Sequence, residues 1–184
     1  MSELKFAKRT TITFAALLLL AGCVSQKKYD ALDQEYQQLQ QSMGAEVGAQ
    51  QMQITRLQNA IKVNVNGELL FPSGGWEMPA QAQQTIAKMA AILAPQQTTT
   101  IIVNGYTDDT PIGPELRRQG VTSNLILSQR RADNVMQFMI SQGVKPNLVT
   151  AQGLGDADPV ASNATPQGKA QNRRVELTLA GSGN

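Results

Sequence analysis

Hydrophobic residues along positions 61–180 recur at two spacings, and the two spacings alternate along the chain. Apolar residues at every second position over 63–65 and 175–179 are typical of half-buried strands. Apolar runs rich in β-branched residues, within 98–104 and 148–151, predict buried strands. Four strand segments are therefore expected in this part of the chain.

The segments between these strands carry apolar residues three and four positions apart, which predicts helices. Pro79 suits the first turn of one helix. Ser123 suits the N-cap of a second helix, which runs over 124–142 and is closed by Gly143. The apolar face of the first helix is Ile86, Met89, Ala90 and Leu93. The shared face of the second helix is expected to be Leu125, Ser128, Ala132, Val135, Met136 and Met139.

The dipeptide Asn66-Gly67 is a hairpin-type turn signal, after which Leu69-Leu70-Phe71 is expected to resume the strand. Strands that alternate with helices predict an α/β sandwich of the α+β class, with helices on one face of a mixed sheet. We assign this domain to residues 61–180 and treat 181–184 as a tail.

A carboxylate and a guanidinium are expected close together at one end of this sheet. Asp108 comes just after the 98–104 strand. Arg131 lies at the edge of the shared face of the second helix, Asn124 lies two turns earlier on the same side, and Arg130 points into water. Asp108, Arg131 and Asn124 would together form a clamp for a small zwitterion.

Residues 26–61 carry apolar side chains three and four apart, with one stutter near Val47. This pattern predicts a long amphipathic helix, either a coiled coil or a solvated spacer. Gly44, Gly48 and Gln50 weaken the apolar seam, so both readings stay open. We assign residues 23–60 to this helical spacer.

The first 22 residues have the pattern of a secretory signal peptide. Lys5, Lys8 and Arg9 precede a short apolar run, and Ala21-Gly22 stand just before Cys23. These small residues before a cysteine resemble a bacterial lipobox, in which the thiol is acylated. Val24 and Ser25 after Cys23 favour outer-membrane sorting by resemblance to enterobacterial rules. An uncleaved anchor or a free thiol is the alternative.

The composition excludes several kinds of site. The chain has no His and one Cys, which excludes a His-based catalytic triad, a zinc site and an internal disulfide framework. Without residues 1–22, the chain carries 13 basic and 13 acidic side chains, so nucleic-acid binding has no electrostatic support. We predict no catalytic residues, no metal and no cofactor.

Five motifs, in order along residues 61–180, resemble the OmpA-like peptidoglycan-binding family. They are Leu70-Phe71-Pro72-Ser73-Gly74, Gly105-Tyr106-Thr107-Asp108, Asn124-Leu125-Ile126-Leu127-Ser128-Gln129-Arg130-Arg131-Ala132, Gly153-Leu154-Gly155 with Pro159, and Asn172-Arg173-Arg174-Val175-Glu176. Pro72 departs from the family's usual Asp, so we assign it no ligand role. The long connection 109–123 resembles that of the flagellar stator protein MotB.

The resemblance implies that the domain holds diaminopimelate of the peptidoglycan stem peptide without covalent bonds. Asp108 would pair with the ligand's side-chain ammonium, and Arg131 would pair with the carboxylate at the same end. Thr107, Asp109 and Asn124 would add hydrogen bonds, and Arg173 would be a second cation.

Purely structural roles are the alternatives for these residues. Asp108 and Arg131 would then form an internal ion pair, and Asn124 would make a hydrogen bond at the start of its helix. Arg173 and Arg174 would pair with Asp156 or Asp158. Two aromatic residues near the motifs, Tyr106 and Trp76, are expected to be packing groups.

The favoured function is that of an outer-membrane lipoprotein, held by acylated Cys23 on the periplasmic face and bound to the cell wall through residues 61–180. The alternative is a component of a larger envelope machine, such as a motor or secretion complex. In that case the N-terminal helix and the 109–123 loop would contact a second copy or a partner protein. A wall hydrolase is disfavoured because no pair of carboxylates is marked out for acid–base chemistry.

Overall fold

The structure is a computed structural model that describes residues 30–43, 52–95 and 97–180. The predicted signal peptide, Cys23, the heptad stutter and the tail lie outside these residues. The chain divides between Gln34 and Glu35 into two compact units. Residues 30–34 of the first unit are helical, and so are 35–43 at the start of the second, where Leu39 and Met43 are buried.

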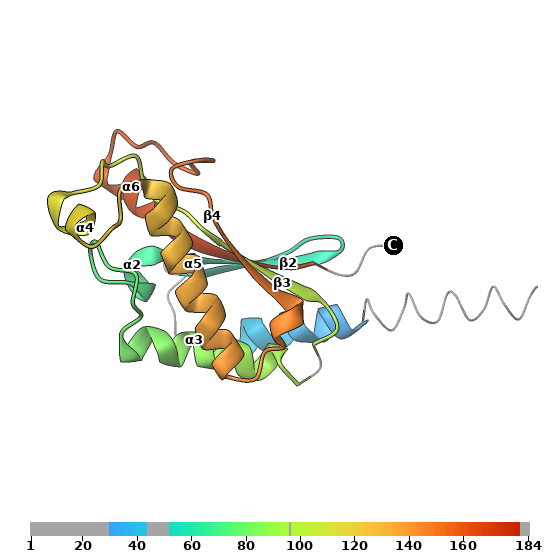
Figure 1. Ribbon diagram of the computed structural model, residues 1–184. Coiled ribbons are helices and arrows are strands. Elements are labelled where there is room, and N and C mark those ends of the chain that lie inside the picture. Colours follow the sequence, from blue (N-terminus) through green and yellow to red (C-terminus); the bar gives the residue numbers. More distant parts are fainter. Residues whose placement is uncertain (1–29, 44–51, 96, 181–184) are drawn as a thin grey trace, which may run out of the picture. The chain divides into compact units, whose positions relative to one another are not determined.

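The second unit contains a five-stranded mixed sheet in the order β1-β2-β5-β3-β4 (Figure 1). The parallel pair is β3 with β4, and the other neighbours are antiparallel. The four strand segments predicted from the sequence are confirmed as β2 to β5. The strands are β1 (Met52–Arg56), β2 (Ala60–Asn66), β3 (Thr100–Gly105), β4 (Val149–Gly153) and β5 (Arg174–Ala180).

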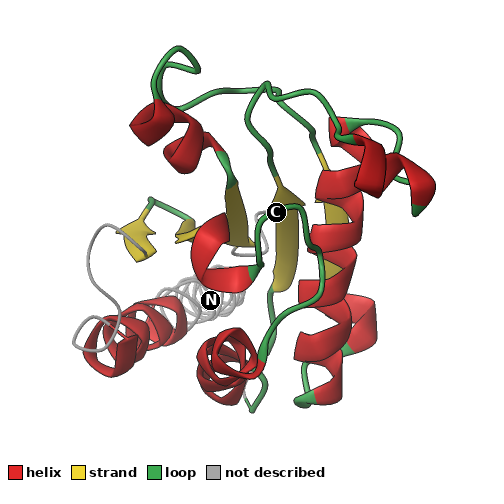
Figure 2. Cartoon of the chain, turned by 90° about the vertical axis from the view of Figure 1, so that its left-hand side faces the viewer, coloured by secondary structure: helices red, strands yellow, loops and turns green. Residues whose placement is uncertain are grey.

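Two long helices, α3 and α5, pack together on one face of the sheet, as predicted for the α+β class (Figures 1 and 2). Three short helices, α2, α4 and α6, gather at one end of the sheet, on the left in Figure 1. No helix of the described residues is long and apolar enough to cross a membrane. The helices are α2 (Gly67–Leu70), α3 (Ala80–Leu93), α4 (Pro114–Arg118), α5 (Asn124–Ser141), the 3-10 helix η1 (Pro146–Leu148) and α6 (Pro166–Asn172).

The prediction that the N-terminal helix continues to residue 60 is wrong for its last part. Residues Met52–Arg56 form strand β1, with Ile54 opposite Val63 of β2. A tight turn closes the pair, because the Leu57 amide donates to the Ala60 carbonyl at 2.8 Å. Met52 and Ile54 therefore follow the period of a strand, and backbone pairing with β2 outweighs their helical spacing.

The predicted hairpin at Asn66-Gly67 is also wrong, because the chain turns there into the short helix α2. The Asn66 side chain accepts a hydrogen bond from the Glu68 amide at 2.8 Å and caps this helix. Gly67 lies against the backbone of Arg173, where a Cβ atom would come within 2.9 Å of the Arg173 carbonyl oxygen.

Helix α5 begins at the predicted cap, since the Ser123 hydroxyl accepts from the Ile126 amide at 3.2 Å. Its buried face differs from the predicted one at the N-terminal end. Leu125 is 57% exposed, whereas Leu127 and Arg131 are buried. Leu127 packs against Ile112 and Val121 of the 109–123 connection. This apolar cluster determines which side of the first turn of α5 is buried.

Two glycines that pair across β3 and β4, Gly105 and Gly153, let α5 approach the sheet through its backbone. A Cβ atom at Gly105 would lie 2.3 Å from the Ser128 carbonyl oxygen, and one at Gly153 would lie 2.3 Å from the Gln129 amide nitrogen. Side chains at these positions would push the helix away from the sheet.

We predict that Gly153→Ala lowers the free energy of unfolding by about 2–3 kcal/mol, because the added methyl group meets helix backbone that has little room to move. Urea denaturation of the purified domain measures the change. The matched control is Gly113→Ala, where an added Cβ atom has nothing within 4 Å. This control is expected to cost at most about 1 kcal/mol, through a weaker N-cap of α4. Equal losses in both variants would contradict the close approach.

Candidate functional site

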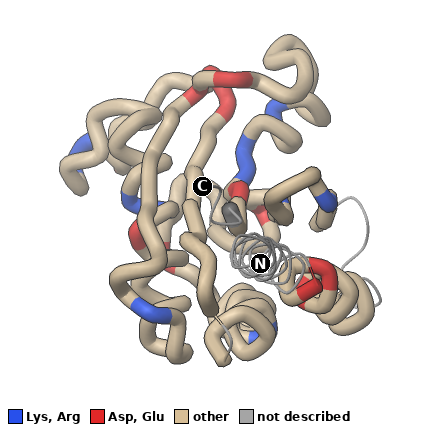
Figure 3. Tube along the Cα trace, turned by 90° about the vertical axis from the view of Figure 1, so that its right-hand side faces the viewer, with Lys and Arg blue, Asp and Glu red and all other residues tan. Residues whose placement is uncertain are grey.

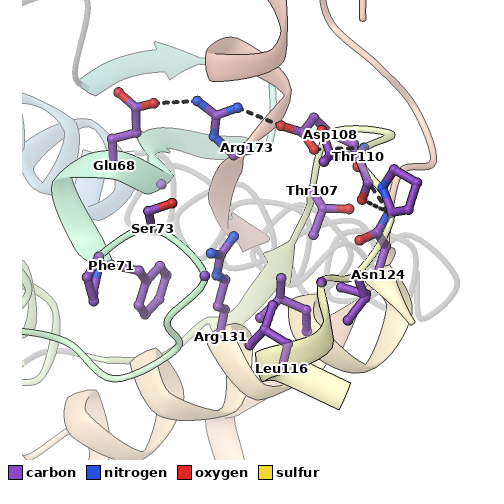
Figure 4. A pocket seen from close by; sticks show the side chains of 17 residues that line it. Glu68, Phe71, Ser73, Thr107, Asp108, Thr110, Leu116, Asn124, Arg131 and Arg173 are labelled. Atoms are coloured by element: carbon purple, nitrogen blue, oxygen red, sulfur yellow. Dashed lines mark hydrogen bonds and ion pairs between the residues drawn. The ribbon is translucent and has the colours of Figure 1, made fainter. Parts of the chain in front are cut away.

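A cavity of about 660 Å³ opens at the end of the sheet where α2, α4 and the start of α5 meet (Figure 4). One wall is apolar and includes Phe71, Leu116 and Leu127. The other side carries charged and polar groups. Of the six predicted ligand-binding residues, five line the cavity: Thr107, Asp108, Asn124, Arg131 and Arg173.

Asp108 is positioned by the loop that leaves β3. The amide of Thr107 donates to the Gly155 carbonyl at 2.7 Å, which fixes this loop on the next one. One carboxylate oxygen of Asp108 accepts from the Thr110 amide at 2.9 Å, and the other accepts from Arg173 at 2.5 Å. Asp108 is 6% exposed. Burial raises its pKa, but the hydrogen bonds from Arg173 and Thr110 outweigh this effect and hold the pKa below 3.8.

Arg173, which follows α6, is the ion-pair partner of Asp108, and Arg131 is not. The Arg173 guanidinium bridges Asp108 and Glu68 of α2. Burial lowers the pKa of Arg173, but these two carboxylates raise it by more. The alternative of an internal ion pair between Asp108 and Arg131 is therefore wrong, and so is the alternative that Arg173 pairs with Asp156 or Asp158.

Arg131 projects from α5 into the cavity beside Phe71 (Figure 4). It is 6% exposed, its Nε donates to the Gly75 carbonyl at 2.9 Å, and its guanidinium lies 5.2 Å from the centre of the Phe71 ring. Within the described part of the chain, no carboxylate forms an ion pair with it. Burial and the nearby Arg173 lower its pKa to about 10, and Asp108 opposes this shift. Arg131 is therefore a buried cation at neutral pH.

The other predicted residues divide between the cavity and the surface. Thr107 is buried, and its hydroxyl oxygen has no hydrogen-bond partner among the described residues. Asn124 does not serve its own helix: its amide nitrogen donates to the carbonyls of Asp108 and Thr110, each at 3.2 Å, and so joins the two loops. Asp109 lies outside the cavity lining and pairs with Lys169 at 2.7 Å.

Residues outside the predicted set also shape the cavity. Glu68 completes the ion-pair chain through Arg173, and Phe71 packs beside Arg131. Phe71 lies in the Leu70–Gly74 motif and Glu68 lies just before it, so this motif could have indicated that both residues belong to the site. Leu116 comes from α4, a five-residue helix in the 109–123 connection, where no helix was predicted. No periodicity in so short a segment could have revealed it.

The two aromatic residues near the site are packing groups, as predicted. Tyr106 is 5% exposed, with the Arg174 guanidinium 3.6 Å from its ring centre. Trp76 packs on the cluster of the 109–123 connection. Arg130, which was expected to point into water, lies over the Trp76 ring at 4.6 Å.

The cavity can therefore attract both signs of charge. It holds a cation without a carboxylate partner, a carboxylate already held by another arginine, and an unpaired buried hydroxyl. Elsewhere, acidic and basic residues are interspersed along the described trace (Figure 3). No cluster of three or more potential metal-ligating residues occurs among the described residues.

Comparisons with known proteins place this geometry in context. The OmpA family model matches residues 70–173. The probable lipoprotein YiaD of Escherichia coli is 39% identical over 69% of this chain, and the peptidoglycan-binding protein ArfA of Mycobacterium tuberculosis is 35% identical over 67%. These matches span 54% of YiaD and 35% of ArfA, so the chain corresponds to about half or less of each relative.

The solved structure of the cell wall anchor of the T6SS from Pseudomonas aeruginosa is similar to this fold. It has a TM-score of 0.70 and 30% sequence identity, and the match covers 78% of this chain and 97% of that one. The family matched here is one of non-enzymatic binding domains.

We predict that Asp108→Asn reduces the loss of stability at acid pH. Because the folded pKa of Asp108 lies below 3.8, its ion pair stabilises the fold fully above that value and is lost as the pH falls through the folded pKa. Urea midpoints measured from pH 5 down to pH 2 should therefore fall less steeply in Asp108→Asn than in the wild type. The control is Asp109→Asn, which removes an exposed ion pair and should follow the wild type. Identical slopes for all three proteins would contradict the role of Asp108.

Proposed function

Since the chain belongs to the OmpA family, we propose that it binds the peptidoglycan stem peptide at diaminopimelate, without covalent bonds, in the cavity beside Arg131. We also propose that acylated Cys23 holds the protein in the outer membrane, so that the chain tethers this membrane to the cell wall. The observation that carries the first proposal is a buried arginine that faces a cavity without a carboxylate of its own.

Arg131 is the proposed receptor for the ligand's carboxylate. The guanidinium fork binds a carboxylate through two parallel hydrogen bonds, and such charge-assisted bonds are among the strongest in proteins. Its Nε is already held by Gly75, so the terminal nitrogens are the groups that would meet the ligand. Burial of this cation costs free energy that a bound anion would recover.

Asp108 is the proposed receptor for the ligand's ammonium, in competition with Arg173. A carboxylate offers about four lone-pair positions, and the protein uses one on each oxygen, through Thr110 and Arg173. An ammonium can therefore join Asp108 beside Arg173 or displace it. Displacement leaves Arg173 paired with Glu68, so no arginine is stranded.

The rest of the cavity suits the uncharged parts of the ligand. Phe71, Leu116 and Leu127 form an apolar wall for the methylene chain of a diamino acid. The unpaired hydroxyl of Thr107 would gain the hydrogen bond that it lacks. Asn124 would act indirectly, by holding the loops of Asp108 and Thr110 in place.

Recognition of both charges explains how one side chain could be selected over another. Diaminopimelate ends in an ammonium and a carboxylate on the same carbon, whereas a lysine side chain has only the ammonium. A lysine-type stem peptide would leave Arg131 buried without an anion, and specificity for a paired group follows from that loss.

The second candidate is a wall-anchoring subunit of a larger envelope machine. The T6SS cell wall anchor matches 78% of this chain at 30% identity, and the 109–123 connection carries α4 beside the cavity. Such a subunit would use the same cavity for the wall and its N-terminal helix or the 109–123 connection for partner proteins. Co-purification of a tagged copy with a stable multiprotein complex would favour this candidate.

We predict that Arg131→Ala abolishes sedimentation of the protein with diaminopimelate-type sacculi, because the ligand's carboxylate loses its cation. The loss should correspond to at least a tenfold weaker affinity, as expected for a charge-assisted pair. The matched control is Arg130→Ala, which removes the same charge from the neighbouring residue outside the cavity lining. Urea midpoints test whether both variants fold.

Lysine-type sacculi serve as the second control and should sediment little wild-type protein. The proposed clamp would be ruled out if Arg131→Ala sedimented with sacculi as well as the wild type does. It would also be ruled out if the wild-type protein bound the two types of murein equally.

We predict that Cys23→Ala releases the protein from membranes into the soluble periplasmic fraction, because two or three acyl chains would be lost. Fractionation and metabolic labelling with a fatty acid measure the change. Sacculus binding by the purified variant should match that of the wild type. Continued membrane association of Cys23→Ala would show that another segment holds the protein there.

A further inference from the structure

A second cavity, of about 780 Å³, lies on the face of the sheet opposite to α3 and α5. Strand pleating places Lys62 and Asn64 on this face, because their neighbours Ile61, Val63 and Val65 are buried on the other. Helix α6 forms one side of it. We name it the amide groove, and its lining is Met52, Gln53, Thr55, Lys62, Asn64, Asn66, Val160, Gln167, Ala170, Gln171, Arg174 and Glu176.

Each charge in the amide groove has a partner, but two cations share one carboxylate, which leaves a net charge of +1. Glu176 pairs with Lys62 at 2.6 Å and with Arg174 at 2.8 Å. Arg174 also donates to the Asp158 carbonyl at 3.1 Å and covers the ring of Tyr106. Burial raises the pKa of Glu176, but the two cations lower it by more, so the carboxylate stays ionised. The groove therefore does not present the isolated cation that marks the first cavity.

The amide side chains, in contrast, are uncommitted. The side chains of Gln53, Asn64, Gln167 and Gln171 make no hydrogen bond to any other residue of the described chain. Gln53 lies directly opposite Asn64 on the neighbouring strand, so their side chains are adjacent on one face. Thr55 adds a hydroxyl on the same strand as Gln53.

This set of groups fits one class of ligand. A primary amide offers two donors and one acceptor, and so can bind hydroxyl and acetamido groups, each of which both donates and accepts. Lys62 and Arg174 are both already paired with Glu176, so the groove does not require a charged ligand. We propose that the amide groove binds a neutral, N-acetylated glycan, namely the sugar strand of the same peptidoglycan. The identity of the polymer rests on the proposed function of the first cavity.

The two cavities share a wall. Asn66 lines the amide groove, and the next residue, Gly67, lines the first cavity. Likewise, Arg174 lines the amide groove and the preceding residue, Arg173, lines the first cavity. The Gly67 amide donates to the Arg173 carbonyl at 2.8 Å, so the two backbone segments of this wall lie side by side. Consecutive Cα atoms are only about 3.8 Å apart. A stem peptide in the first cavity therefore lies close to the groove that would take the glycan to which it is attached.

The test uses the N-acetylglucosamine hexamer, which carries no peptide and no charge. Isothermal titration or NMR titration of the wild-type protein should show binding, with shifts in the side-chain amides of Gln53, Asn64 and Gln171. The double variant Gln53→Ala/Asn64→Ala should bind at least tenfold more weakly, since two hydrogen-bonding groups are lost. Gln171→Ala, on α6, is an independent second variant.

The matched control is Gln152→Ala, which removes an exposed amide from β4 outside the amide groove and should leave hexamer binding unchanged. Failure of the wild type to bind the hexamer, or equal binding by the wild type and both groove variants, would overturn the proposal. Arg131→Ala should bind the hexamer as the wild type does, although it no longer binds sacculi. Hexamer binding thus tests the amide groove, and sacculus binding by Arg131→Ala tests the first cavity.

Discussion

The structure depends on the contact between helix α5 and strands β3 and β4. Gly105 and Gly153 are paired in register, and neither carries a side chain that would hold the helix off the sheet. Side chains of the helix then bond to the end of β4 and the loop after it: the side-chain oxygen Oε1 of Gln129 accepts from the Gly153 amide at 2.7 Å, and the Ser128 hydroxyl accepts from the Gly155 amide at 2.8 Å. This contact sets the depth and rotation of α5, and so sets where Arg131 enters the cavity.

The cavity keeps one charge, that of Arg131, which forms no ion pair with a carboxylate of the described chain. Arg131 is buried beside another cation, and its lowered pKa reflects that unfavourable position. The apolar core behind it, with Ile101, Val103 and Leu177 fully covered, supplies stability that does not depend on the site. A fold stabilised elsewhere can tolerate an unpaired charge where a ligand is to bind, which is how preorganised sites are usually built.

Elements with a local or periodic sequence signal were predicted correctly. The cap at Ser123, the strand before Asp108 and the alternation over 175–179 each depend on near neighbours, and each appears as expected. The prediction failed at Met52–Arg56, where a helical spacing of apolar residues coincided with that of a strand. Pairing with β2 decided between the two, and pairing is a contact across the chain that no local window contains.

The sequence by itself determined the class of the fold, the order of its main elements β2, α3, β3, α5, β4 and β5, and the set of polar residues at the end of β3 and the start of α5. These follow from hydrophobic period, caps and motifs, which are properties of neighbouring residues. Only the tertiary structure decided that Asp108 pairs with Arg173, that Arg131 is left without a carboxylate, and that amides converge on the opposite face of the sheet. Those outcomes depend on which distant segments meet, because an ion pair forms where packing brings two charges within reach.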